Sequence, residues 1–314
     1  MRRWQKITAW SVGGLLALIL LVIGTLLIIG NTDSGRDLIV RMTSRLTNGK
    51  VQIAGIHGSF PASLDLDRLQ LADDDGIWLY AEAISLRWTP SDLLFRHIKV
   101  DTLHVDLLHM ERTPLPDKEK KPSTTPSIPH ADLASLTVDR LELGKALTGE
   151  PASLKVKGSA HLRSLQDMTA EVTAQRTGGN GDYAAQIQFD PSRMDATLKV
   201  QEPANGPLEN LIKVPGLGEL SLLARLSGPR NAEDIQLTLD AGPLRGRARG
   251  TINLVQSSAD LEYSLTAPAM TPYPGRSGGA DAAARMLAMM SLFASAYCCT
   301  SVQVRLASSR LTAR

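Results

Sequence analysis

The chain has 314 residues and a formal net charge of +2, with 34 basic residues interspersed among 32 acidic ones. A nucleic-acid-binding protein needs a basic stripe with interleaved aromatic side chains, and no such stripe occurs here. Because aromatic residues make up only 4% of the sequence, stacking platforms for bases or sugars are also disfavoured, and the buried surfaces are expected to be aliphatic.

The first predicted element is a membrane anchor over residues 1–30. No charged residue occurs from Ile7 to Gly30, and a helix of that run would be about 36 Å long, enough to cross a hydrocarbon core of about 30 Å. Basic residues precede the run, which favours a single pass with a cytoplasmic N-terminus. The alternative is a cleavable signal peptide, although the apolar core is too long for one and no A-x-A-like cleavage site follows it.

A connector over residues 31–50 follows, with an amphipathic helix expected at 33–47 that lies near the membrane surface or leads into the first strand. Strands are expected from Val51 onward, with a turn at 73–76 between two of them. Thr89 and Pro90 predict a short helical turn, since Thr caps a helix and Pro suits its first position.

One strand pattern occurs three times, at residues 64–71, 98–105 and 136–143. Apolar residues alternate with polar ones, the alternation slips by one residue at an aspartate, and it then resumes. A slip of one residue turns the apolar set to the other face unless a bulge absorbs it and bends the sheet. Asp67, Asp101 and Asp139 are therefore candidate bend points of a curved sheet.

Residues 113–130 contain five prolines and a charged run, which predicts a solvated loop. From Leu154 to about Thr266, short alternating segments separated by Gly and Pro predict an antiparallel meander. One face of it carries Lys, Arg, Gln and Thr, so the other is a continuous aliphatic surface that must be covered. Such a sheet can pair with a second sheet as a sandwich, or curl around its own apolar face and leave a groove.

If the sheet curls, the inward-facing residues of the meander would line the groove. The candidates are Val156, Ala160, Ile187, Leu198, Val200, Leu222, Leu237, Leu239, Ile252 and Leu254.

The composition changes in residues 276–314, which form an atypical tail. The strand rhythm stops at Pro274 and Gly275, and the only two cysteines, Cys298 and Cys299, occur beyond that point. We interpret this segment as foreign to the fold, as a frameshifted or truncated reading frame would leave it. A cysteine-free body suits an oxidising compartment without a disulfide framework.

No arrangement of catalytic residues stands out. The six histidines show no metal-ligand spacing such as H-E-x-x-H, although His104 and His109 flank one strand and leave a chance metal pair open. Phosphate-binding and dinucleotide-binding glycine motifs are missing, as is a nucleophile elbow. We therefore expect a protein that is not an enzyme and that uses no cofactor and no metal.

Several segments resemble the start of the TamB family, the inner-membrane subunits of the translocation and assembly module of Gram-negative bacteria, within the AsmA-like group. The resemblance covers about residues 1–275 and rests on segments 30–35, 53–59, 69–78, 84–90 and 98–105. It is most specific between Ile53 and Val105. Members of the family are several times longer, and their partner-binding end is C-terminal.

The resemblance implies a mainly β fold: an N-terminal transmembrane helix, then a curved, largely antiparallel sheet that forms an open aliphatic groove, a β-taco. The body, residues 51–275, would lie in the periplasm and shield phospholipid acyl chains on their way to the outer membrane. The family also bears on outer-membrane protein assembly through the outer-membrane partner TamA, whose binding region has no counterpart in this sequence. The alternative is a membrane-anchored scaffold with a closed β-sandwich and no lipid ligand, followed by an anchored hydrolase.

Overall fold

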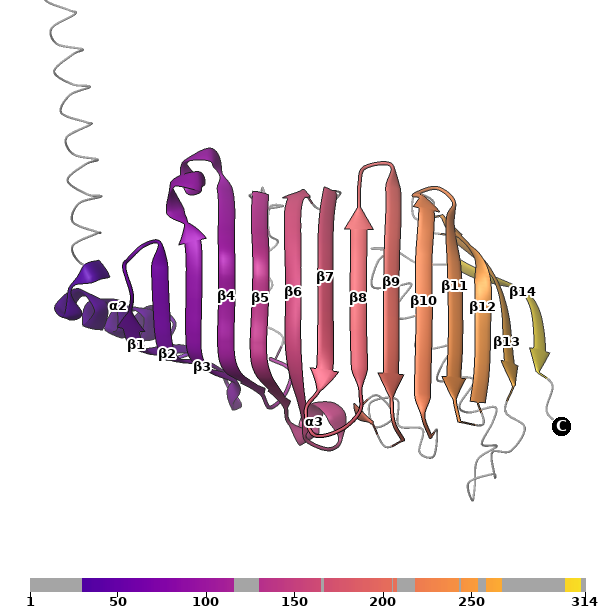
Figure 1. Cartoon of the computed structure of the whole chain (residues 1–314), viewed down its shortest axis with the longest axis horizontal. Helices are drawn as coiled ribbons and strands as arrows, with labels where there is room; N and C mark the ends of the chain where they lie inside the picture. The colour runs from indigo at the N-terminus through magenta and orange to yellow at the C-terminus, as the bar shows by residue number, and fades with distance from the viewer. Residues whose placement is uncertain are drawn as a thin grey trace, which may run out of the picture.

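A computed structural model describes residues 30–115, 130–164, 167–204, 206–207, 218–242, 244–253, 258–266 and 303–311. These residues form one 14-stranded sheet in which the strands lie side by side in chain order (Figure 1). The predicted mainly β, largely antiparallel fold is therefore confirmed. The alternative of two sheets packed as a closed sandwich is not what the described residues form.

The N-terminal half of the sheet contains the longer strands, and a 3-10 helix, η1 (Pro90–Phe95), separates β3 from β4 at the predicted helical turn. The strands are β1 (Val51–His57), β2 (Ser63–Asp73), β3 (Gly76–Thr89), β4 (His97–Met110), β5 (His130–Leu143) and β6 (Ala152–Ser164). A short helix, α3 (Lys145–Thr148), lies between β5 and β6.

The C-terminal half follows the predicted meander. Its strands are β7 (Asp167–Arg176), β8 (Asp182–Phe189), β9 (Arg193–Glu202), β10 (Leu220–Pro229), β11 (Glu233–Ala241), β12 (Leu244–Asn253) and β13 (Ser258–Thr266). Residues of the atypical tail contribute one more strand, β14 (Gln303–Leu311).

Two neighbouring pairs are parallel. The strand β5 runs parallel to β4, and β14 runs parallel to β13, whereas every other pair of the sheet is antiparallel. A parallel pair cannot be closed by a tight turn. The chain between Met110 and His130, which contains the proline-rich segment, supplies the long connection between β4 and β5.

The helix α2 (Asp33–Leu46) matches the predicted connector helix. Its N-cap, Thr32, accepts a hydrogen bond from the Gly35 amide, and Asp33 and Arg45 complement the helix dipole at the two ends. The Arg36 guanidinium donates to the carbonyl oxygen of Gly58 over 2.7 Å, and the helix packs against β1 at the edge of the sheet.

No helix of the described ranges has the length and apolar composition needed to cross a membrane. The predicted anchor falls on residues before Gly30, which lie outside those ranges.

Five neighbouring strands, β1 to β5, each contain one extra residue that interrupts the alternation of side chains, and these five residues lie at the same level of the sheet. We call them the bulge line. In each pair of neighbouring strands among these five, the extra residues have no register partner, whereas the residues immediately before and after them are paired. The register therefore continues unchanged until the β5–β6 pair, where it shifts between Val138 and Leu141. The bulge line consists of Gly55, Asp67, Ala83, Asp106 and Asp139.

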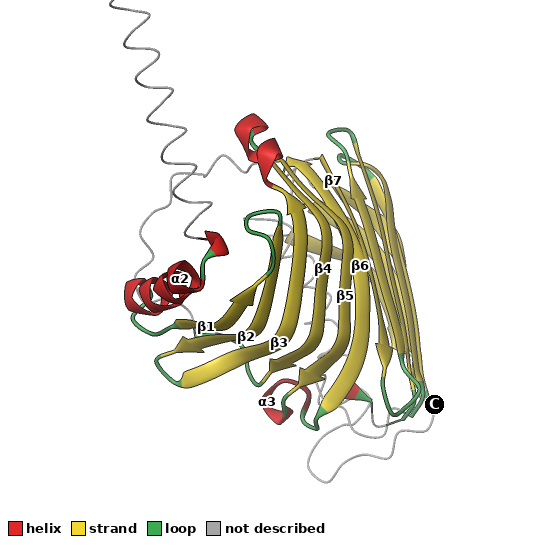
Figure 2. Cartoon of the chain, turned by 60° about the vertical axis from the view of Figure 1, so that its left-hand side comes forward, coloured by secondary structure: helices red, strands yellow, loops and turns green. Residues whose placement is uncertain are grey.

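Two of the three candidate bend residues, Asp67 and Asp139, thus lie on one line across the sheet. The third, Asp101, lies at a second irregularity, where the β3–β4 register shifts between Arg87 and Trp88. Bulges increase strand twist and bending, and β2, β3 and β4 are visibly bent along their length (Figure 2).

Candidate functional site

The apolar side chains of the sheet form rows that run from strand to strand, because residues directly opposite in register point to the same face. The first row crosses twelve consecutive strands, and all of its members except Tyr183 and Gly246 are aliphatic. It consists of Ile56, Leu66, Ile84, Val105, Val138, Val156, Ala174, Tyr183, Val200, Leu222, Leu239 and Gly246.

Two further rows run beside the first on the same face. The second consists of Leu64, Leu86, Leu103, Leu136, Gly158, Val172, Ala185, Leu198, Ala224, Leu237 and Ala248. The third consists of Trp88, Val100, Leu133, Ala160, Ala170, Ile187, Ala196, Leu226 and Ile235.

The groove candidates from the sequence therefore lie together on one face. Eight of them belong to the three rows named above, in β6, β8, β9, β10 and β11. Ile252 lies on the same face of β12, opposite Glu233. Leu254 is outside the described residues.

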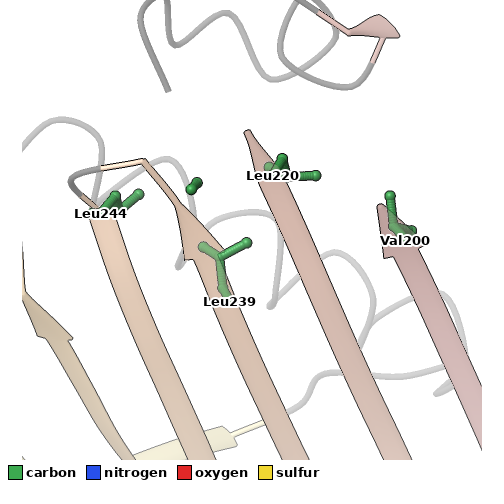
Figure 3. Close-up of a cluster of buried hydrophobic side chains, with 5 residues drawn as sticks. Val200, Leu220, Leu239 and Leu244 are labelled. Carbon is green, nitrogen blue, oxygen red and sulfur yellow. The ribbon is translucent and has the colours of Figure 1, made fainter. Parts of the chain in front are cut away.

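Burial on this face is deepest in two places. Ala81, Ile84, Val105 and Val138 form one buried cluster, on either side of the bulge line. The second lies along one end of β9 to β12 (Figure 3) and contains Val200, Leu220, Leu239, Ala241 and Leu244. Between these clusters most side chains of the second and third rows are only partly buried, and Val172 is 40% exposed.

The strands bend toward the apolar face at the bulge line. On the apolar side of the line, Ile84 and Val138 are 8% and 4% exposed. On the opposite side, the side chains of Asp106 and Asp139 are 60% and 43% exposed. Crowding on the apolar side and exposure on the polar side indicate that the apolar face is the concave one there, and Figure 2 shows the sheet curved into an open trough.

Neighbouring strands make the most extensive contacts among the described elements. Apart from these, α2 packs on β1 and η1 packs on β4. Both positions are peripheral, so neither element extends over the three apolar rows.

Two buried acids interrupt the apolar face, and the sequence analysis did not identify them. Glu202 and Glu233 are 2% and 0% exposed, at opposite ends of the strands. The Tyr183 hydroxyl donates a hydrogen bond to Glu202, and burial together with this carboxylate holds the pKa of Tyr183 well above its ordinary value. Glu202 is two residues after Val200, and Glu233 is two residues before Ile235, so strand alternation places both acids on the apolar face. This spacing is the sequence signal by which they could have been predicted.

Burial raises the pKa of Glu233 to about 7, and the nearby Arg230 guanidinium only partly opposes this effect. Neither carboxylate oxygen of Glu233 has a hydrogen-bond partner. Protonation is the ordinary response of such a group to an apolar environment.

The polar face of the sheet carries a shallow hollow of about 850 Å³ over β6 to β10. Its cationic lining residues are Lys155, Lys157, Lys199 and Arg225, and Asp182 is the acidic one. Because this hollow lies on the face opposite the aliphatic rows, it is a separate feature from the trough.

Comparison of the chain with protein-family models, with curated proteins and with solved structures finds no match.

Proposed function

We propose that the apolar face of the sheet, which is concave at the bulge line, binds the acyl chains of phospholipids. In this proposal the chain is the N-terminal part of a TamB-like protein that serves anterograde phospholipid transport and outer-membrane protein assembly. It would be anchored in the inner membrane, with its body in the periplasm. The observation that carries the proposal is the set of three aliphatic rows on a single open sheet, partly exposed over its middle.

The apolar face of the sheet carries more aliphatic surface than the described residues cover. A row of Leu, Val, Ile and Ala that stays partly exposed is an unfavourable surface in water, and large patches of this kind usually mark interaction sites. Each methylene group that enters such a surface contributes about 0.8 kcal/mol. A saturated acyl chain is therefore a fitting ligand, since it is unbranched, carries no polar group and can follow a row from strand to strand.

The dimensions also suit acyl chains. The first row crosses twelve strands, and at a spacing of about 4.8 Å it is roughly 50 Å long. One leaflet of a hydrocarbon core is about 15 Å thick, so the trough is long enough for several acyl chains in series.

The helix α2 supports a position next to a membrane surface. Leu38, Met42 and Leu46, spaced one helical turn apart, are 43%, 49% and 79% exposed. A photo-crosslinking amino acid at Leu46 should form lipid adducts in intact membranes, whereas one at Thr43, which is half-buried, should not. Equal lipid adducts at both positions would contradict this placement.

The test of the main proposal is native mass spectrometry of the full chain after gentle extraction. Bound phospholipid is expected in the unsubstituted protein. Leu198→Asp, Leu222→Asp and Leu237→Asp should each abolish lipid binding and lipid crosslinking while the strands stay folded, because each places a charge among the apolar rows where acyl chains would lie.

Matched controls lie one residue away on the polar face, at Thr197, Ser221 and Gln236. Aspartate there should leave lipid binding unchanged. The competing function is a scaffold whose apolar face is covered by protein and holds no lipid. It predicts protein without phospholipid, and variants at the three leucines that lose stability.

A further inference from the structure

Three histidines of β4 lie on the polar face of the sheet, and each lies beside a carboxylate from β5. His97 Nε2 lies 2.6 Å from Asp132, His104 Nε2 lies 2.8 Å from Asp106, and His109 lies between Glu111 and Glu142. Only the arrangement around each imidazole distinguishes the three clusters, and that arrangement decides what each can bind.

We propose that His104, Asp106 and Asp139 form a binding site for a divalent transition-metal ion, with Zn²⁺ as the representative ligand. Both carboxylates face the same ring nitrogen: His104 Nε2 lies 2.8 Å from Asp106 Oδ1 and 3.4 Å from Asp139 Oδ2. One ligand atom from each residue lies within 4.8 Å of the other two. A small cation between these three atoms can be contacted by all of them.

The other two clusters lack this convergence. In the His109 cluster the carboxylates occupy different ring nitrogens, Glu142 at Nδ1 and Glu111 at Nε2. In the His97 cluster the two oxygens of Asp132 point to different imidazoles, those of His97 and His161. Both arrangements satisfy their groups by hydrogen bonds alone. At His104, by contrast, two anionic oxygens share the one N–H that Nε2 can offer.

The parallel register of β4 and β5 explains why these residues meet. Asp106 and Asp139 are the extra residues of the parallel strands β4 and β5, at the same level between Val105↔Val138 and Leu107↔Arg140. His104 and Asp106 are two residues apart on β4, so both point to the polar face by ordinary strand alternation, and Asp139 lies at the level of Asp106 on the neighbouring strand.

The chemistry of the three ligands favours a transition metal over Mg²⁺ or Ca²⁺. Imidazole nitrogen is a ligand for Zn²⁺ and its neighbours, whereas Mg²⁺ and Ca²⁺ take oxygen ligands almost exclusively. Binding uses the lone pair of Nε2, and in the neutral imidazole the ring proton is then on Nδ1. The side chains remain 35%, 60% and 43% exposed for His104, Asp106 and Asp139, which gives an ion direct access from solvent.

A lysine competes with the cation. Lys155 Nζ lies 2.9 Å from the other oxygen of Asp139, and this contact holds the pKa of Asp139 below its ordinary value. The carboxylate is therefore ionised at neutral pH, as a metal ligand must be. The positive charge beside it also repels an incoming cation, so removal of that charge should strengthen metal binding.

Isothermal titration of the full-length, tag-free protein with Zn²⁺ tests the proposal. His104→Ala should weaken the tightest site at least tenfold, since even the loss of an outer-shell partner costs about 10-fold to 100-fold. Lys155→Gln should tighten it by up to about 30-fold, the factor that one unit charge about 4 Å from a divalent ion is worth in water. His109→Ala is the matched control, from the same strand and with the same number of carboxylate neighbours, and it should leave this site unchanged.

Three results overturn the proposal. The first is an unchanged Zn²⁺ affinity in His104→Ala. The second is an equal loss of affinity in His109→Ala, which would indicate nonspecific binding to surface histidines. The third is an affinity in Lys155→Gln that does not rise, since the lysine would then not face the ion. Circular dichroism of each variant separates a loss of metal binding from a loss of fold. The outcome is independent of the lipid experiments, which concern the opposite face.

Discussion

At the scale of single residues, the buried carboxyl of Glu233 makes stability depend on pH. Its pKa is raised from 4.5 to about 7, so the folded state holds the proton more tightly than the unfolded state does. Stability from this group is then fully present at acidic pH and is lost as the pH rises through that interval, by roughly 3 kcal/mol.

Glu233→Gln should remove most of this loss, because the amide has the same shape and no charge. Thermal unfolding of the unsubstituted protein should show a melting temperature that falls between about pH 5 and pH 8, and the variant should show a much smaller fall. Asp234→Asn, at the exposed next position, is the control and should keep the full dependence. A variant whose melting temperature still falls as steeply would mean that another group is responsible.

Glu233 also shows what sequence patterns predict and what they leave open. Alternation places it in phase with Ile235 and Leu237, so its face could be predicted. Its burial could not, because complete exclusion from solvent depends on how closely other segments approach that strand end. The same holds for the metal-site candidates, since His104 and Asp139 come from strands whose pairing is not local in the sequence.

At the scale of elements, the bulge line rests on two residues with positive φ. Gly55 has φ +63° and Ala83 has φ +50°, a conformation that costs an L-residue about 1–2 kcal/mol. A Cβ on Gly55 would also lie 1.8 Å from Asp67 Oδ2, so a side chain there has no room.

We therefore expect opposite effects of two small substitutions. Gly55→Ala should lower the free energy of unfolding by about 2 kcal/mol or more, whereas Ala83→Gly should raise it or leave it unchanged, with a gain of up to about 1 kcal/mol. Urea unfolding measures both. Gly179→Ala is the control, since its Cβ would meet its nearest neighbour at 3.5 Å, and it should be nearly neutral. Destabilisation by Ala83→Gly would contradict the assignment.

The slip in alternation could be predicted in the strands where an aspartate marks it, at Asp67, Asp101 and Asp139. Its continuation through Gly55, Ala83 and Asp106 could not, because it becomes visible only when the strands are aligned. The parallel pairing of β4 with β5 was missed for a related reason. Two strands with the same pattern pair equally well in either direction, and only the length of the proline-rich connection hints that a crossover is possible.

At the scale of the whole molecule, the two ends of the sheet differ. The edge strand β1 is flanked by α2, whereas β13 pairs with β14 from the far end of the sequence. Open edges invite further strands, so a sheet of this kind can lengthen at one end while the other is held by its helix. The mainly antiparallel character was predictable from short alternating segments separated by Gly and Pro, and the curvature from the slips in alternation at the aspartates.

The order of the strands has one more consequence. Each strand touches the strands before and after it in the chain, so the sheet is a linear array whose cohesion is a sum of nearest-neighbour terms, as in solenoid proteins. Such arrays open from their ends or at a weak link without losing the remainder. A strand pair could therefore part briefly to admit a bulky molecule from the side while the rest of the array keeps its shape.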